Sequence, residues 1–157
     1  MVQRILVLID GTRSSASVIP HAADMASRMG LQVDLLLVEP ERGARLPHPE
    51  HHRNGEQGGE SGKATLGPPT DEEMKKANQR YLARHAEEFK ELKVKTTQHV
   101  RRGKPVDEIL KAALDLRADF IAMATRYRGQ HARPEKRSVA EEVLWRSRLP
   151  VLLVAEG

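Results

Sequence analysis

The stretch RILVLIDGT, residues 4–12, decides the fold class of this chain. Its apolar residues follow one another without the polar alternation of a half-exposed strand, so a strand over 4–9 should be buried on both faces of a parallel sheet. Asp10, Gly11 and Thr12 then end the strand. Because such a strand needs helices on both sides of the sheet, helices and strands should alternate along the rest of the chain.

The rest of the chain shows this alternation. Thr70 and Ser138 are each followed three positions later by Glu, a capping box that marks the start of a helix. Pro105 suits the first position of a helix, and Gly30 suits the end of one. We predict strands over 4–9, 31–38, 94–100, 120–124 and 151–154, and helices over 15–29, 70–91, from 105 onward, and over 138–147.

Apolar spacing predicts which side of each helix is buried, because residues three and four positions apart share a face. Trp145 is expected to be a partly buried packing residue. The expected buried sets are Val18, Ala22, Met25, Ala26 and Met29 in the first helix, Ala77, Tyr81, Leu82 or His85, and Phe89 in the second, and Ile109, Leu110, Ala113, Leu114 and Leu116 in the third.

The alternation predicts an α/β fold with a single doubly wound, five-stranded parallel sheet and helices on both faces, a Rossmann-like or flavodoxin-like architecture. With the first strand central, the strand order is 3-2-1-4-5. Ligands of open α/β sheets bind where the strand order reverses, here between the carboxyl ends of strands one and four. Asp10 and the loop after Ala124 are expected to line that crevice.

Composition indicates one domain over residues 1–157. Hydrophobic residues make up 39% of the chain and charged residues 31%, which suits one buried core. The sequence has no cysteine, no apolar run of membrane-spanning length and no signal-peptide pattern, so we expect a cytoplasmic protein without a membrane partner. Residues 41–70 are rich in Gly, Pro, His and Glu, which predicts a flexible polar insertion.

The net charge of +4 is concentrated in residues 124–138, which contain five cationic side chains and one acidic side chain. Two interpretations remain open: a solvated basic loop, or a surface that attracts anions. The basic residues are not interleaved with aromatic residues along a strand or a helix, so we expect no nucleic-acid partner.

Five segments of the chain together resemble the universal stress protein family. They cover nearly the whole chain outside 41–70, and their order and spacing carry the resemblance. It implies a homodimer in which the last strand, Val151–Val154, pairs across a two-fold axis, and an uncovered apolar edge strand also invites pairing on general grounds. The five segments are Ile5–Thr12, Gly103–Pro105, Asp119–Thr125, Ser138–Val143 and Pro150–Val154.

The resemblance also implies a nucleotide site. In members that bind ATP, a glycine, two residues, a second glycine, nine residues, and a third glycine followed by Ser or Thr hold the phosphates. That spacing falls here on Ala124, Tyr127, Arg137 and Ser138, so all three glycines are replaced. Asp10 and the backbone of Val38 would contact the adenine and ribose end. The implied cofactor-binding set is Asp10, Val38, Met123, Ala124, Thr125, Tyr127, Arg137, Ser138 and Val139.

Two outcomes follow for ATP. Glycines let the backbone approach phosphate closely, so the bulky Tyr127 and Arg137 should impair the phosphate site. Alternatively, Arg126, Arg128 or Arg137 replaces the lost backbone donors with charged ones, and the protein remains an ATP-dependent switch. We expect impairment, because added charge does not remove a steric clash. In a third interpretation, the basic loop or the 41–70 insertion binds a partner.

Two of the candidate residues also have plainer roles. Asp10 before Gly11 can simply form a turn, and Ser138 with Glu141 can simply cap a helix. Without the family resemblance, the sequence does not choose between these roles and ligand binding for Asp10.

The remaining motifs indicate neither a metal site nor an enzyme. His48, His51 and His52 lie close together, but no acidic or thiolate residue accompanies them at a metal-ligand spacing, so we expect no metal site. No catalytic motif emerges. We therefore expect a binding protein that dimerises, with ATP or another anion as candidate ligand and at most a very slow ATPase activity.

Overall fold

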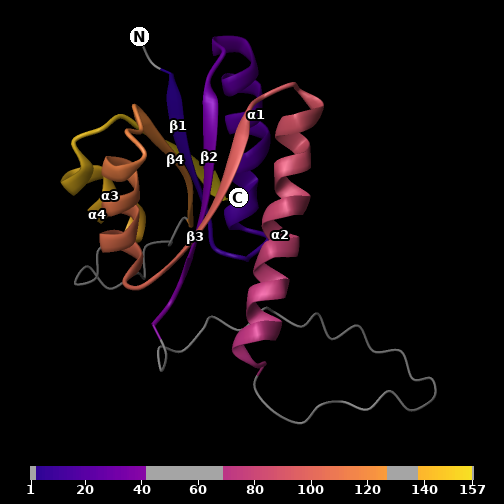
Figure 1. Cartoon of the computed structure of the whole chain (residues 1–157). Coiled ribbons are helices and arrows are strands. Elements are labelled where there is room, and N and C mark those ends of the chain that lie inside the picture. Colours follow the sequence, from indigo (N-terminus) through magenta and orange to yellow (C-terminus); the bar gives the residue numbers. More distant parts are fainter. Residues whose placement is uncertain (1–2, 42–68, 127–137, 157) are drawn as a thin grey trace.

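The computed structural model describes residues 3–41, 69–126 and 138–156. They form one five-stranded sheet in which every pair of neighbouring strands is parallel (Figure 1). The strand order is β3-β2-β1-β4-β5, which confirms the predicted topology. The strands are β1 (Arg4–Ile9), β2 (Gln32–Glu39), β3 (Thr96–Arg102), β4 (Phe120–Arg126) and β5 (Val151–Glu156).

Helices cover both faces of this sheet, with α1 and α2 on one side and α3 and α4 on the other (Figure 1). A short 3-10 helix, η1, precedes α1, so the first predicted helix begins with a 3-10 turn and becomes α-helical after it. The helical elements are η1 (Ser15–Ser17), α1 (Val18–Met29), α2 (Asp71–Glu91), α3 (Pro105–Asp115) and α4 (Val139–Ser147).

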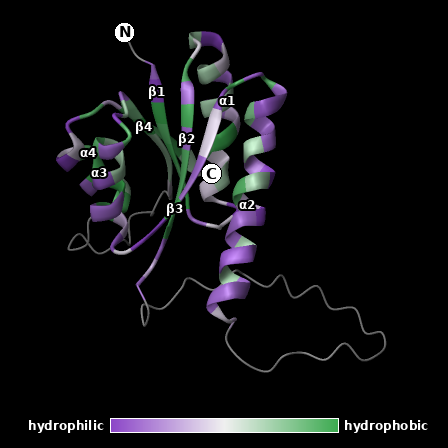
Figure 2. Cartoon of the chain, in the orientation of Figure 1, coloured by the Kyte–Doolittle hydropathy of each residue, from purple (hydrophilic) through white to green (hydrophobic). Residues whose placement is uncertain are grey.

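The central strand β1 is buried on both faces, as its uninterrupted apolar run predicts. Ile5, Val7 and Ile9 belong to the core beneath α1 and α2, whereas Leu6 and Leu8 belong to the core beneath α3 and α4. Figure 2 shows the apolar colour concentrated in β1, β2 and β4, and polar colour along much of α2. The two cores lie on opposite sides of one sheet because successive strand residues point to opposite faces.

The predicted helix signals occupy their expected positions. Thr70 Oγ1 accepts the Glu73 N–H at 3.3 Å, and the Glu73 carboxylate accepts the Thr70 N–H at 2.8 Å, so the capping box of α2 is complete. Pro105 stands in the first turn of α3. Gly30 ends α1 with φ of 67°, a left-handed conformation that glycine adopts without steric cost.

Four residues that were expected to be at least partly buried are exposed. Met29 is 55% exposed, Leu114 79% and Trp145 72%, and Ala77 is exposed as well. The prediction for Trp145 is wrong because α4 buries a narrow face that consists of Ala140 and Val143. Ala77 lies in the N-terminal third of α2, whereas the buried residues of α2, Leu82, Ala86 and Phe89, all lie in its second half.

The predicted insertion over 41–70 lies almost entirely outside the described residues. Within the described part, β2 ends at Glu39 and α2 begins at Asp71. Among the helices that the structure describes, none is both long and apolar enough to cross a membrane.

Candidate functional site

The hydrogen bonds between β1 and β4 stop before the carboxyl end of either strand. β1 pairs with β2 as far as Ile9 and Leu37, but it pairs with β4 only as far as Val7 and Ala122. Beyond that point β4 continues beside β5 alone. This is the place where the strand order reverses, and open α/β sheets bind ligands at such a switch point.

The sequence-predicted residues that the structure describes lie on the carboxyl side of the sheet, around this switch point. Asp10 directly follows β1 and is exposed, and Val38 is half-buried near the end of β2. Met123 is buried in β4, and the next two residues, Ala124 and Thr125, are half-buried. All three belong to the part of β4 that has lost its pairing with β1.

Two of the predicted residues, Tyr127 and Arg137, lie outside the described residues. They are the positions on which the expected steric block of the phosphate site depends. The predicted histidine cluster at 48–52 is outside them too. Across residues 3–41, 69–126 and 138–156, no group of three or more His, Asp or Glu side chains is placed to hold a metal ion.

Asp10 holds the turn that follows β1, which we call the β1 loop (residues 10–15). Its Oδ1 atom accepts the Thr12 N–H at 2.9 Å and the Thr12 hydroxyl at 2.6 Å. Gly11 between them has φ of 86°, which a side chain would disfavour. Asp10 therefore forms the turn after β1, which is the structural role that its sequence context also allowed. Its second oxygen, Oδ2, has no hydrogen bond within the described part of the chain and remains an acceptor.

Ser15 closes the β1 loop from its other end. The Ser15 hydroxyl oxygen accepts the Asp10 N–H at 3.0 Å, and the hydroxyl donates to the Thr12 carbonyl oxygen at 3.0 Å. The Ser15 N–H donates to the Thr12 hydroxyl oxygen at 3.1 Å. These reciprocal bonds hold the loop in one conformation, in which the Asp10 carboxylate stands just past the end of β1.

Tyr81 reaches this loop from α2. Its hydroxyl donates to the Thr12 carbonyl oxygen at 3.0 Å and lies 3.3 Å from the Ser15 hydroxyl. Burial raises the pKa of the Tyr81 hydroxyl, and the negative charge of Asp10 acts in the same direction. The hydroxyl therefore stays protonated and remains a donor. Apolar spacing had assigned Tyr81 to packing only, and its polar contact was missed because Thr12 is 69 positions away.

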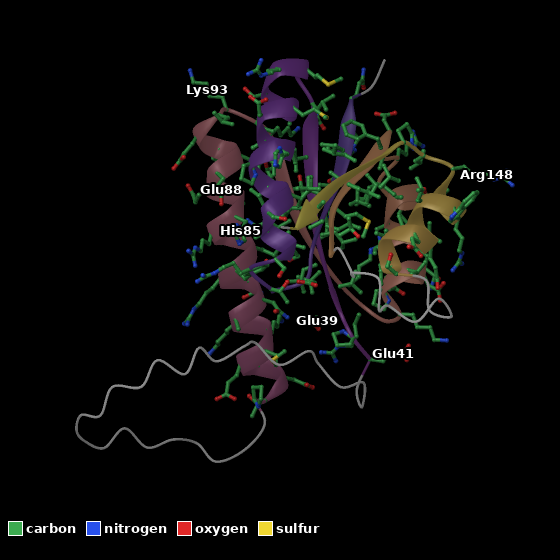
Figure 3. All side chains as sticks on the ribbon, turned by 180° about the vertical axis from the view of Figure 1, so that it is seen from behind. Glu39, Glu41, His85, Glu88, Lys93 and Arg148 are labelled. Atoms are coloured by element: carbon green, nitrogen blue, oxygen red, sulfur yellow. The ribbon has the colours of Figure 1, made fainter. Side chains whose placement is uncertain are left out.

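Glu39 ends β2 one strand away from the switch point. Its Oε1 atom accepts a hydrogen bond from the Asn78 side chain of α2, and its Oε2 atom accepts two from Arg102 of β3, at 3.0 and 3.2 Å. Figure 3 shows Glu39 well below Lys93, the residue that follows α2 near the top of the molecule. Glu39 thus joins three elements at the carboxyl side of the sheet.

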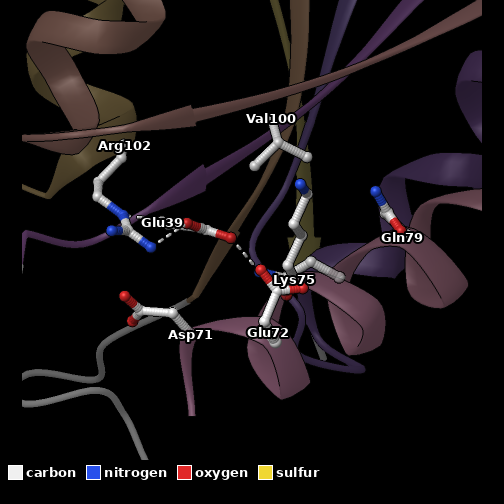
Figure 4. A pocket seen from close by; sticks show the side chains of 8 residues that line it. Glu39, Asp71, Glu72, Lys75, Gln79, Val100 and Arg102 are labelled. Carbon is white, nitrogen blue, oxygen red and sulfur yellow. Dashed lines mark hydrogen bonds and ion pairs between the residues drawn. The ribbon is translucent and has the colours of Figure 1, made fainter.

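A pocket of about 370 Å³ opens beside Glu39 (Figure 4). Its walls are the N-terminal half of α2 and the ends of β2 and β3, so it is separate from the switch point. Acidic, basic and amide side chains line it together with one exposed valine. The lining residues are Glu39, Asp71, Glu72, Lys75, Asn78, Gln79, Val100 and Arg102.

The start of α4 is internally capped, as its sequence predicts. The Ser138 hydroxyl oxygen accepts the Glu141 N–H at 3.2 Å, and the Glu141 carboxylate accepts the Ser138 N–H at 3.3 Å. Val139, the next residue, is 40% exposed. A phosphate approaching this helix end would meet the negative Glu141 carboxylate, which already occupies one of the backbone donors that helix N-termini offer to anions.

Among known protein families, one matches almost the whole chain. The family model described as "Universal stress protein family" matches residues 1–155. A comparison with curated protein sequences gives no significant match.

Solved structures share the fold of the whole chain at low sequence identity. A universal stress protein in complex with cAMP is 17% identical, with a TM-score of 0.69 over 98% of this chain and 97% of that one. A universal stress protein from Archaeoglobus fulgidus in complex with dAMP is 17% identical, with a TM-score of 0.61 over 98% and 97%. A family protein from Arabidopsis thaliana with AMP bound is 14% identical, with a TM-score of 0.61 over 99% and 92%.

Proposed function

The chain belongs to the universal stress protein family, and we propose that it is a cytoplasmic stress-response protein that acts by binding and dimerisation. Its ligand in this proposal is the adenosine part of a nucleotide, and its phosphate site is impaired for ATP. Catalysis has no part in the proposal, because the sequence contains no evident base to activate water.

The separation of β1 from β4 is the observation that carries the proposal. It leaves the end of β1, with Asp10, unpaired on the side where β4 presents Ala124 and Thr125. The Asp10 Oδ2 atom, free within the described residues, is an acceptor of the kind that a ribose hydroxyl or an adenine amino group requires. The three structural neighbours described above hold cAMP, dAMP and AMP, all of which combine an adenine with a single phosphate.

The phosphate end of the proposed site differs from the base end. In the sequence, Ala124, Tyr127 and Arg137 replace the glycines that hold a triphosphate in ATP-binding members, and side chains at such positions are expected to keep the backbone away from the ligand. The capping carboxylate of Glu141 adds a negative charge at the start of α4. We therefore expect a preference for adenosine, AMP or cAMP over ATP.

Isothermal titration of the purified protein with adenosine, AMP, cAMP and ATP with Mg²⁺ tests this proposal. We expect binding of at least one of the first three and weak or no binding of ATP. Restoring the three glycines, with Ala124→Gly, Tyr127→Gly and Arg137→Gly together, should raise ATP affinity by at least about tenfold, the equivalent of one regained charge-assisted hydrogen bond.

Two carboxylate substitutions control this experiment. Asp10→Asn should weaken every adenine ligand, adenosine included, because it replaces the acceptor at the base end. Asp24→Asn should change nothing, since Asp24 pairs with Arg28 on the exposed side of α1. Micromolar binding of ATP to the unaltered chain would contradict the impaired site and favour the alternative, an ATP-dependent switch in which arginines replace the glycine loop.

Dimerisation forms the second part of the proposal. β5 is the last strand of the sheet, and within the described residues it pairs only with β4. Leu153 in this strand is 38% exposed. An apolar edge strand of this kind is prone to pair with another strand, and a second copy of the chain supplies an identical edge.

A further inference from the structure

Two polar side chains of α2 contact the ends of two neighbouring central strands. Asn78 and Tyr81 lie three positions apart and therefore share one side of the helix. Asn78 donates to Glu39 at the end of β2, and Tyr81 donates to the Thr12 carbonyl oxygen just past the end of β1. These strand ends provide Val38 and Asp10, which form the base end of the proposed nucleotide site.

The Tyr81 hydroxyl is the contact that reaches the β1 loop itself. Among the described residues, no other side chain from outside the loop hydrogen-bonds to it. The Thr12 carbonyl oxygen accepts both from Tyr81 and from Ser15, and the hydroxyl groups of Tyr81 and Ser15 are 3.3 Å apart. Ser15 in turn binds the N–H of Asp10. A continuous hydrogen-bond network thus joins α2 to the backbone of Asp10.

The Tyr81 ring is held independently of this network. It packs against the core formed beneath α1 and α2, and it meets the His85 ring edge-on at 4.7 Å between centroids. Burial keeps the hydroxyl protonated by raising its pKa. A donor on a packed ring has little freedom to move, so the loop takes its position from the helix.

We propose that Tyr81 is a positioning residue, which holds the β1 loop in the conformation that presents Asp10 to the adenosine end of a nucleotide. The proposal rests on the function proposed above. It predicts that removal of the Tyr81 hydroxyl oxygen changes both the dynamics of the β1 loop and the affinity for every ligand that contains adenosine. By linkage, the bound ligand should also protect the Tyr81 contact.

The Tyr81→Phe variant tests this proposal, because it removes the hydroxyl and keeps the ring. In the ligand-free protein, amide hydrogen exchange at Thr12 and Ser15 should become about three- to tenfold faster, as expected for one lost hydrogen bond. Affinities for adenosine and for AMP, measured by titration calorimetry, should fall by the same factor. A loss confined to AMP would overturn the proposal, since Tyr81 is placed at the base end.

A merely structural role of Tyr81 would give another pattern. Phe89→Leu is the matched control, because Phe89 is fully buried in the same helix but lies near the carboxyl end of α2, away from the β1 loop. This variant should lower the melting temperature without changing loop exchange or ligand affinity. If the Tyr81→Phe variant behaves in the same way, Tyr81 is a packing residue and the proposal is wrong.

The experiment separates this inference from the proposed function. If the unaltered protein binds none of the adenine ligands, the proposed function fails, and the hydrogen-exchange measurement still decides whether Tyr81 positions the loop. Unchanged exchange at Thr12 and Ser15 in Tyr81→Phe overturns the positioning role, whatever the ligands do.

Discussion

At the scale of single residues, Asp34 has the most unusual environment in the described chain. It is the third residue of β2, near the amino end of the strand, and it is 1% exposed. Arg4 donates to its Oδ2 atom from Nη2 at 2.9 Å and from Nε at 3.1 Å, and His99 Nε2 lies 2.9 Å from its Oδ1 atom. A carboxylate can be buried only when such partners replace its hydration.

Replacement of Asp34 should therefore cost stability without affecting the proposed site, which lies at the other end of the strands. We expect Asp34→Asn to lower the free energy of unfolding by about 1–3 kcal/mol, because the hydrogen bonds to Arg4 and His99 lose their charged acceptor. Urea denaturation, monitored by circular dichroism, measures this change in the free energy of unfolding. The exposed pair of Asp24 and Arg28 gives the control, and Asp24→Asn should cost far less.

At the scale of helices and strands, neighbouring residues in the sequence determine where a helix begins. They do not determine which face of the helix is buried. Both capping boxes form as predicted because their partners are only three positions apart. The buried face of a helix depends instead on which strands lie beneath it. Leu114 is exposed for this reason, although it continues an apolar pattern in the sequence. Trp145, which was expected to be partly buried, is exposed for the same reason.

The capping role of Ser138 can be separated from a role in phosphate binding. Ser138→Ala should destabilise the protein by about 1 kcal/mol, the usual cost of losing an N-cap side chain. If Ser138 only caps α4, the ratio of the AMP and adenosine affinities stays unchanged, and this is the result we expect from an impaired phosphate site. Chemical denaturation and titration calorimetry give the two measurements.

Thr70→Ala provides the comparison, since it removes the same kind of cap from α2. It should cost a similar amount of stability and leave the affinity ratio unaltered. A selective loss of AMP binding in Ser138→Ala would show that the start of α4 contacts phosphate, in disagreement with our proposal.

At the scale of the whole molecule, the sheet has two edges of different character. β3 forms one edge with mostly polar residues, and β5 forms the other with the apolar run Val151–Val154. Asn78 and Arg102 bind Glu39 close to the β3 edge. The β5 edge is therefore the better candidate for an interface between two copies.

We expect light scattering coupled to size-exclusion chromatography to give twice the chain mass of 17.6 kDa at micromolar concentration. Leu153→Lys should convert this dimer to a monomer, because it places a charge on the proposed interface. Val100→Lys is the matched control at the other edge, where Val100 is 43% exposed, and it should remain dimeric. A monomeric unaltered chain would refute the dimer, whereas dissociation by Val100→Lys alone would place the interface at β3.

The class of fold, the strand order, the helix caps and the family of this protein could all be predicted from its amino-acid sequence. Each of these depends on patterns within one segment or on the order of segments along the chain, and the apolar run 4–9 is the clearest example. For the candidate site, sequence and resemblance supplied Asp10, Val38 and the residues of β4, but not the groups that hold them. The contacts of Tyr81 with Thr12, 69 positions away, and of His99 with Asp34, 65 positions away, could not be predicted from the sequence and are seen in the folded chain. Such contacts require the whole sheet and its covering helices, because the polar partners meet only after the chain has folded back on itself.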